Sequence, residues 1–145
     1  LEDSPKYIAS EMCQIFGNYW GYAKRDFNFK SLIEIIEDFC ICRRYGANYL
    51  LNIGPMGNGQ LRPLDKAMLG ALGEWVDIYK EALYLPRPAK IEIENKEKNF
   101  LLKGNGCYYF FAYDLEVSAN INVELAKEKL DRNNVFIFNE KIKSI

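Results

Sequence analysis

One carboxylate lies close in sequence to a cluster of aromatic residues near the start of the chain. Glu11 is followed by the run Asn18-Tyr19-Trp20-Gly21-Tyr22. Aromatic rings stack on the C–H face of sugars, and cleavage of a glycosidic bond uses a pair of carboxylates. Glu11 and Trp20 therefore supply one group of each kind that a sugar site needs. A surface carboxylate beside a packed aromatic cluster fits the same residues, so both interpretations stay open.

The residue types exclude several other chemistries. The chain has no His, so it cannot form a Ser-His or Cys-His nucleophile pair by itself, and any catalysis within it would fall to carboxylates. Its four cysteines, Cys13, Cys40, Cys42 and Cys107, form no CxxC pair. We interpret them as free thiols and expect neither a metal site nor a cofactor.

Charge and hydropathy narrow the class of protein further. With 19 basic and 20 acidic residues the net charge is -1, and no basic stripe is present. This balance argues against nucleic acid and anionic membrane as partners. No apolar run approaches the ~20 residues needed to cross a bilayer. The chain starts at Leu1 with no charged-then-apolar leader, so we expect a fragment without a visible signal peptide and infer no compartment.

The first half of the chain predicts one amphipathic helix. Residues 1–22 are expected to be irregular to extended. A helix is predicted over 29–45, with Asn28 as N-cap or, one turn later, Ser31 with Glu34 as a capping box. Residues at steps of three and four, all apolar except Arg43, predict one buried stripe: Phe29, Leu32, Ile33, Ile36, Phe39, Cys40 and Arg43. Gly46 then ends the helix in the left-handed conformation.

A buried strand and a second helix follow. Residues 48–53 carry apolar side chains on both sides of the pleat, which predicts a strand covered on both faces, as in a parallel sheet. The glycine-rich stretch 54–59 breaks the strand. It could cradle a phosphate, but it lacks the Lys and Ser/Thr of a P-loop, so we favour a tight turn. A helix is predicted over 63–79, with Pro63 at its first position.

The order helix, buried strand, glycine loop, helix is that of one repeat of a (β/α) barrel. Such folds keep their chemistry at the carboxyl ends of the strands. A complete barrel takes roughly 250 residues, so at most about two of its eight units fit in this chain. We therefore expect an α/β fold that is the C-terminal portion of a (β/α) barrel over residues 1–84.

The tail has a different pattern. Pro86 and Pro88 suggest a short stiff linker, and short apolar runs follow at 91–94, 100–103, 107–113 and 135–138. Gly104-Asn105-Gly106 predicts a turn between two of them. Residues 85–145 are therefore expected to form an antiparallel β module that is incomplete.

Several of these segments together resemble the α-L-fucosidases of glycoside hydrolase family 29. Their catalytic domain carries the series WE-x-C, SWGY and GGN-LLNIGP-x-x-DG near its C-terminal end. The order and spacing match over about residues 9 to 84, and the tail resembles more loosely the family's C-terminal β-sandwich, cut short. The matching stretches are 11–22 (EMCQIFGNYWGY), 46–59 (GANYLLNIGPMGNG), 73–75 (GEW) and 81–84 (EALY).

The resemblance implies a barrel enzyme that releases α-linked L-fucose from fucosylated glycans with retention of configuration. The family's Asp nucleophile and sugar-binding His residues come from earlier strands, so the rest of the parent barrel is a necessary partner and this chain alone should be inactive. Trp20 matches the aromatic residue that packs on the fucose ring. Glu11 matches the motif Glu that serves as general acid/base in one branch of the family.

The chain departs from the family pattern at several positions. Ser10 stands where Trp precedes the motif Glu, and Tyr19 replaces the Ser before Trp20. Asn58 replaces an Asp in the glycine loop, and Tyr79-Lys80 replaces an Asn-Gly helix end. These departures indicate a divergent member.

An alternative of a different class is a non-catalytic carbohydrate-binding or interaction module. On this interpretation the β tail is the functional part, and its aromatic residues form a stacking surface: Tyr108, Tyr109, Phe110, Phe111 and Tyr113. Alternation along a strand would place half of these rings in the core. A degenerate barrel that serves only as a scaffold is a third option.

Overall fold

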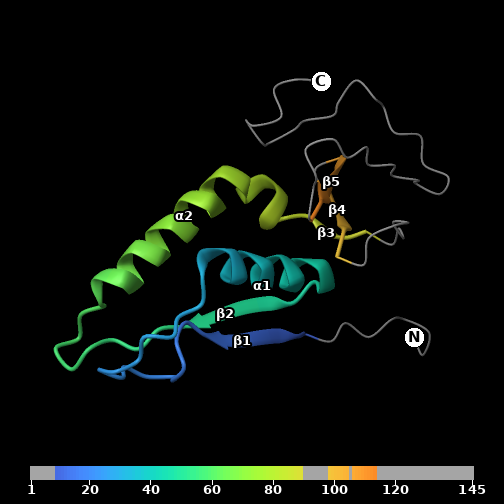
Figure 1. Ribbon diagram of the computed structural model, residues 1–145. Helices are drawn as coiled ribbons and strands as arrows, with labels where there is room; N and C mark the ends of the chain where they lie inside the picture. The colour runs from blue at the N-terminus through green and yellow to red at the C-terminus, as the bar shows by residue number, and fades with distance from the viewer. Residues whose placement is uncertain (1–8, 90–97, 105, 114–145) are drawn as a thin grey trace.

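A computed structural model describes residues 9–89, 98–104 and 106–113. Within them a strand–helix–strand unit lies beside one long helix, and a small three-stranded sheet lies near the C-terminal ends of the two helices (Figure 1). The coarse prediction of a mixed α/β fold is confirmed. The strands predicted at 91–94 and 135–138 lie outside the described residues.

The first sheet consists of two parallel strands, β1 (Glu11–Ile15) and β2 (Asn48–Asn52). Their register pairs Glu11 with Asn48 at one end and Ile15 with Asn52 at the other. Both strands therefore end at the same edge of the sheet. The sequence did not predict β1 as a regular strand, because its five residues show no alternation, and pairing with β2 fixes its extended conformation.

Helix α1 (Leu32–Tyr45) connects the two strands. Ser31 is its N-cap: the Ser31 hydroxyl accepts from the Glu34 backbone N–H at 3.2 Å, and the Glu34 carboxylate accepts from the Ser31 N–H at 2.7 Å. The second of the two predicted starts is therefore confirmed, and Asn28 as N-cap is wrong. Gly46 ends the helix with φ 69°, as predicted.

We expect Ser31→Ala to lower the free energy of unfolding by about 1 kcal/mol, because the first-turn N–H groups of α1 lose their acceptor. Ser31→Asp keeps an acceptor at the N-cap and should stay close to the unchanged protein. Chemical denaturation of the three proteins measures the difference. Equal losses in both variants would mean that the capping box does not hold this end of the helix.

One face of the β1–β2 sheet packs against the helices, and the other is open in this chain. The Phe39 ring lies 5.8 Å from the Tyr49 ring, and Leu51 lines an apolar crevice with Ile35 of α1 and Met68 of α2. Leu50, on the opposite face, is 41% exposed. The predicted burial of this strand on both faces is therefore wrong for the described residues, because only one layer of helices covers the sheet.

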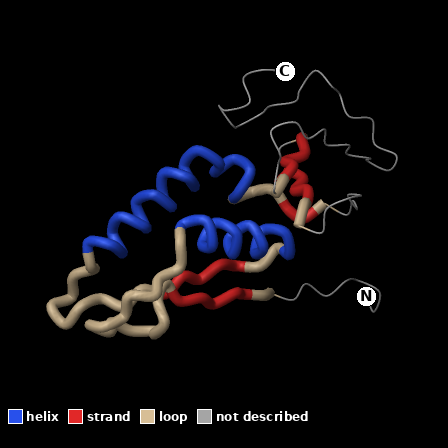
Figure 2. The backbone as a smooth tube through the Cα atoms, viewed as in Figure 1, coloured by secondary structure: helices blue, strands red, loops and turns tan. Residues whose placement is uncertain are grey.

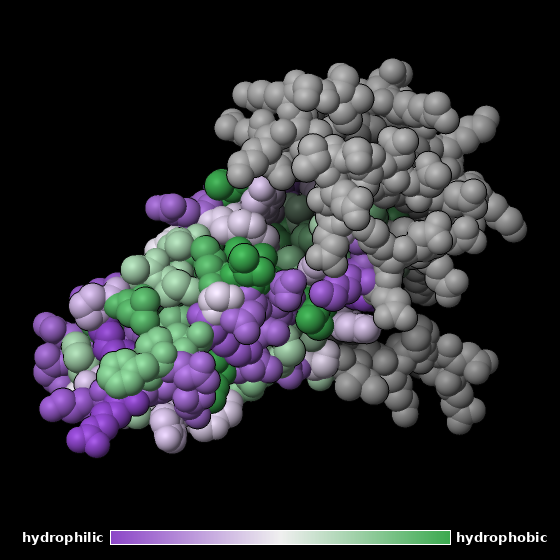
Figure 3. Space-filling model, viewed as in Figure 1, coloured by the Kyte–Doolittle hydropathy of each residue, from purple (hydrophilic) through white to green (hydrophobic). Residues whose placement is uncertain are grey.

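The predicted stripe of α1 also differs in one respect. Cys40 is buried as predicted, together with Ile35 and Cys42, whereas Ile33 is 71% exposed. Other helical apolar residues, including Ile78, are exposed too. Figure 3 shows apolar side chains in patches among polar ones on the face in view.

Helix α2 (Pro63–Leu83) begins with Pro63 at its first turn, as predicted, and extends four residues beyond the predicted end at Tyr79. Trp75 packs edge-on against Phe39 of α1, with ring centroids 6.0 Å apart. Its last turn contributes the fully buried Leu83. Among the described residues, neither helix combines the length and the apolarity that a membrane span requires.

The second sheet is antiparallel and has the strand order β3 (Arg87–Pro88), β4 (Phe100–Gly104), β5 (Cys107–Phe111). The two strands β4 and β5 confirm the predictions for this region. The predicted linker is wrong, because Pro86 is fully buried and Pro88 pairs with Leu102.

The second sheet packs on α1 rather than standing apart (Figure 2). Its core side chains Phe100, Leu102 and Tyr109 form one buried cluster with Cys40 of α1. Burial raises the pKa of the Cys40 thiol to about 11, so this group stays protonated at neutral pH. The Arg43 guanidinium also donates to the Pro86 carbonyl at 2.6 Å.

Candidate functional site

Two loops leave the carboxyl edge of the parallel sheet. The aromatic loop, residues 16–31, joins β1 to α1, and the glycine loop, residues 53–62, joins β2 to α2. Figure 1 shows both loops gathered at this end of the strands. In parallel α/β folds, ligands bind at the carboxyl ends of the strands. These loops are therefore the place to search for a site.

The aromatic loop is fixed at both of its ends. The Phe16 N–H donates to the Asn52 carbonyl at 3.1 Å, and the Lys30 N–H donates to the Phe16 carbonyl at 2.9 Å. The Phe16 ring, 2% exposed, stacks on Phe29 with centroids 5.3 Å apart. The start and the end of the aromatic loop are therefore held together by the packed rings of Phe16 and Phe29.

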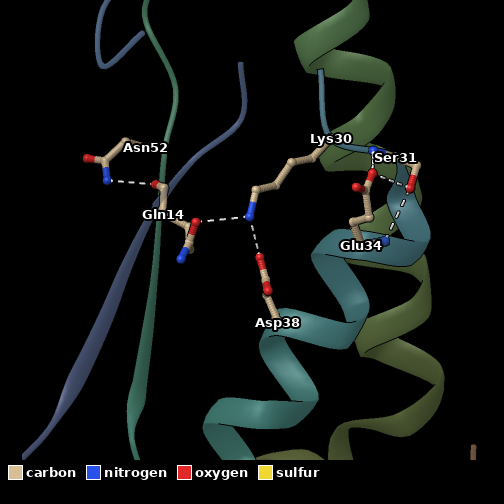
Figure 4. A network of polar contacts seen from close by, with 6 residues as sticks. All are labelled: Gln14, Lys30, Ser31, Glu34, Asp38 and Asn52. Carbon is tan, nitrogen blue, oxygen red and sulfur yellow. Dashed lines mark hydrogen bonds and ion pairs between the residues drawn. The ribbon is translucent and has the colours of Figure 1, made fainter. Parts of the chain in front are cut away.

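The Lys30 ammonium adds a polar connection at the same place (Figure 4). It donates to Gln14 Oε1 of β1 at 2.9 Å and forms an ion pair with Asp38 of α1. The Asn52 side chain of β2 donates to the Gln14 carbonyl at 2.9 Å. One network therefore joins both strands and α1 below the aromatic loop.

Asp26 holds the neck of the aromatic loop. It is 6% exposed, and its carboxylate accepts from the Asn18 N–H at 2.8 Å, the Asn18 side-chain amide at 3.2 Å and the Asn28 N–H at 3.3 Å. The Asn28 side chain also donates to Asn18 Oδ1 at 3.0 Å. We call Asp26 with Asn18 and Asn28 the Asp26 clasp.

Arg62, the last residue before α2, packs under the aromatic loop. Its guanidinium lies 4.6 Å from the Phe29 ring centroid and 5.8 Å from that of Tyr22, within the range of cation–π attraction. Asp65, which is fully buried, accepts from Arg62 Nε at 3.0 Å and from Nη2 at 2.9 Å. These hydrogen bonds are the main reason that the pKa of Arg62 is raised, so its charge is permanent.

The glycine loop contacts the aromatic loop directly. Gly54 is buried, and a Cβ placed on it would lie 2.2 Å from the Tyr22 backbone nitrogen. The tip of the glycine loop closes on itself, since the Met56 N–H donates to the Gln60 carbonyl and the Gly59 N–H donates to the Met56 carbonyl, each at 2.8 Å. This geometry agrees with the tight turn that the sequence favours, because both amides are used within the loop.

Three rings of the aromatic loop are largely exposed to solvent. Trp20 and Tyr19 are each 61% exposed, and Phe27 is 81% exposed. An exposed indole on an anchored loop is a suitable platform for stacking on a sugar ring. The structure thus places Trp20 at the edge where a parallel α/β fold binds its ligand.

Glu11 lies at the opposite edge. It is the first residue of β1, it is exposed, and its carboxylate accepts a short hydrogen bond from the Asn48 side chain. Four residue steps along β1, about 13 Å at the rise of a strand, separate it from Ile15, the last residue before the aromatic loop. The structure does not bring Glu11 and Trp20 together, and the acid/base role of Glu11 stays a prediction.

Sequence reasoning did not single out Asp26, Arg62 or Asp65. The stretch Asp26-Phe27-Asn28 carried a usable signal, because an Asp side chain that accepts from the backbone two residues later forms an Asx turn. The contacts of Arg62 with Phe29 and Tyr22 join segments far apart in sequence, so no local pattern could have shown them.

The aromatic residues of the tail are mostly used within the fold. Tyr109 is buried and donates to Glu81 of α2 at 2.8 Å, and Phe111 stacks on Phe100 with centroids 4.4 Å apart. The stacking surface that the binding-module alternative requires is therefore reduced in the described strands.

The strand–helix–strand unit has the arrangement of a parallel α/β fold. Two solved structures align with this chain: a bacterial fucosidase with a monovalent iminocyclitol inhibitor, and a covalent intermediate of a GH29 alpha-L-fucosidase from Bacteroides thetaiotaomicron. Each aligns at a TM-score of 0.70 and 29% identity, over 81% of this chain and 27% of the other. These proteins are glycoside hydrolases.

The sequence comparisons agree. A family model described as alpha-L-fucosidase matches residues 2–81. Tissue alpha-L-fucosidase of Macaca fascicularis is 34% identical over 109 residues, and that of Homo sapiens is 33% identical over 109 residues. Each alignment covers 71% of this chain and 23% of the relative, so the chain spans about a quarter of these proteins. The chain belongs to the alpha-L-fucosidase family.

Proposed function

We propose that this chain is part of a fucosidase that releases α-linked L-fucose from fucosylated glycans with retention of configuration. The observation that carries the proposal is the anchored aromatic loop, with exposed Trp20 at the carboxyl edge of a sheet that aligns with fucosidases. The covalent intermediate trapped in the Bacteroides relative supports retention, which proceeds through a glycosyl-enzyme.

We propose further that residues 1–84 form the last units of a (β/α) barrel and that residues 85–145 form part of a β-sandwich. The open face of the β1–β2 sheet supports the first part, because a barrel would cover it with the other strands and turn Leu50 inward. The antiparallel β3–β4–β5 sheet supports the second. The rest of the barrel would supply the nucleophile.

Trp20 is the proposed sugar platform. The loop ends are fixed by the Phe16–Phe29 pair, and the tip is held by the Asp26 clasp. A ring presented in this way loses little conformational freedom when the substrate binds, so stacking contributes more of its energy to affinity.

The test is hydrolysis of an aryl α-L-fucoside by the complete polypeptide that carries this chain, with the anomer released followed by NMR. We expect turnover with net retention, and no turnover by the 145-residue chain alone. Binding of fucosylated glycans without turnover by the complete polypeptide would favour the binding module. Neither binding nor turnover would favour a degenerate scaffold.

From the placement of Glu11 we expect Glu11→Gln to lower kcat/KM by less than about tenfold. The loss of a general acid/base would instead cost about 10²–10⁴-fold. The side chain sits at the amino edge of the sheet and is bonded to Asn48. Kinetics of the variant in the complete polypeptide measure the effect. A loss of a thousandfold or more would assign the acid/base role to Glu11.

A further inference from the structure

We infer that Asp26 is a positioning residue, which fixes Trp20 in the place where the sugar binds. The inference rests on the proposed fucosidase function. Its basis is the Asp26 clasp, which joins the two sides of the aromatic loop just below the tip that carries Trp20.

Asp26 is not placed to react with a substrate. Its carboxylate is buried, and three N–H groups of Asn18 and Asn28 donate to its two oxygens. The chain passes so close that a Cβ on Gly17 would lie 2.3 Å from Asp26 Oδ2. A carboxylate enclosed in this way acts through the backbone that it holds.

The tip depends on such contacts more than on core packing. Tyr19 and Trp20 are mostly exposed, so burial of their rings contributes little to the conformation of residues 19–25. The Asp26 N–H donates to the Ala23 carbonyl at 3.2 Å, which forms a turn within the tip. The Asp26 side chain therefore holds Asn18, just before the tip, and the Asp26 backbone holds Ala23 within it.

The groups around the Asp26 carboxylate are hydrogen-bond donors and one cation. The N–H donors of the clasp point at the carboxylate, and the positive charge of Arg62 lies close enough to interact with it. Arg62 also lies over Phe29 and Tyr22, which flank Asp26 on its two sides in sequence. Asp26→Ala would remove the acceptor on which the N–H groups of Asn18 and Asn28 converge.

A double-mutant cycle in the complete polypeptide tests the inference. Asp26→Ala should raise KM for an aryl α-L-fucoside about tenfold and change kcat less, an effect within the range of coupling that double-mutant cycles measure between linked residues. In the Trp20→Ala background, the same substitution should change KM by less than about twofold, because the ring that Asp26 positions is already gone. Independent, multiplicative effects of the two substitutions would overturn the inference.

Two controls separate positioning from general loss of stability. Ile35→Val removes a methyl group from a buried side chain of α1, and we expect it to leave KM unchanged. Asp26→Asn keeps the size of the side chain and one acceptor oxygen, so its KM should fall between those of the unchanged protein and Asp26→Ala. If Ile35→Val raises KM as Asp26→Ala does, the effect is one of stability and the inference fails.

Limited trypsin digestion gives a readout that does not depend on activity. Lys24 and Arg25 lie in the tip, so opening of the clasp in Asp26→Ala should speed cleavage there several-fold, with no such change in Ile35→Val. If trypsin cleaves Asp26→Ala no faster than the unchanged protein, the inference that Asp26 holds the tip fails, whatever the kinetics show. Absence of fucoside hydrolysis by the unchanged polypeptide would instead overturn the proposed function, so the two failures are distinguishable.

Discussion

Trp20→Ala should lower kcat/KM for an aryl α-L-fucoside by about 10–100-fold. Burial of an apolar side chain contributes about 1.5–3 kcal/mol of free energy, which corresponds to a loss of this size. The indole is 61% exposed in this chain and lies at the carboxyl edge of the parallel sheet. A bound sugar would cover it, so removal of the ring deletes contact area that the complex needs. We expect a smaller loss for Trp20→Phe, which keeps an aromatic face.

Trp75 provides the matched control. Its ring packs against Phe39 and Tyr79 within the helical layer, with centroids 6.0 and 5.4 Å away, far along the chain from the aromatic loop. Trp75→Phe should lower the melting temperature of the complete polypeptide and leave KM unchanged. If the kinetics of Trp20→Ala match those of the unchanged protein, Trp20 is not the sugar platform.

Gly54→Ala should have the largest effect on stability, with a loss of about 3 kcal/mol or more in the free energy of unfolding. A Cβ at this position would lie 2.2 Å from the Tyr22 nitrogen and 2.3 Å from the Gly21 carbonyl carbon. Both atoms belong to backbone, so no side-chain rotation can relieve the overlap. The two loops would have to separate, and Trp20 would be displaced with them.

Gly57→Ala is the control for this substitution. It lies in the same glycine loop, but a Cβ there would meet nothing within 4 Å and its φ is not positive. We expect its free energy of unfolding to stay within about 0.5 kcal/mol of the unchanged protein. Denaturant unfolding of both variants in the complete polypeptide measures the contrast. Equal stability of the two variants would contradict the close approach of the loops.

Local signals predicted much of the fold. The capping box at Ser31 and the left-handed Gly46 are each set by a few neighbouring residues, and both were among the predicted features. Strand β1 was not recognised, because its extended form depends on pairing with β2, more than thirty residues later in the chain. The buried Pro86 was interpreted as linker for a similar reason: its contacts come from Arg43 and Gly104.

The site was predictable only in part. The aromatic cluster with Trp20 stands out in the sequence, and the structure exposes that ring on the loop at the carboxyl edge of the parallel sheet. Glu11 lies close to Trp20 in sequence, but an extended strand of five residues separates it from the aromatic loop, and its acid/base role stays a prediction. The Asp26 clasp could not be predicted from the sequence, because its formation depends on which backbone N–H groups the folded chain brings to the carboxylate.

The most direct test of where the sugar site lies compares Trp20→Ala with Glu11→Gln in one assay. The measurement is kcat/KM for an aryl α-L-fucoside, with each variant prepared in the complete polypeptide. We predict the larger loss for Trp20→Ala, at about 10–100-fold, and a loss below about tenfold for Glu11→Gln. A Glu11→Gln variant that loses activity by a thousandfold, beside a Trp20→Ala variant that retains it, would contradict a site at the carboxyl edge.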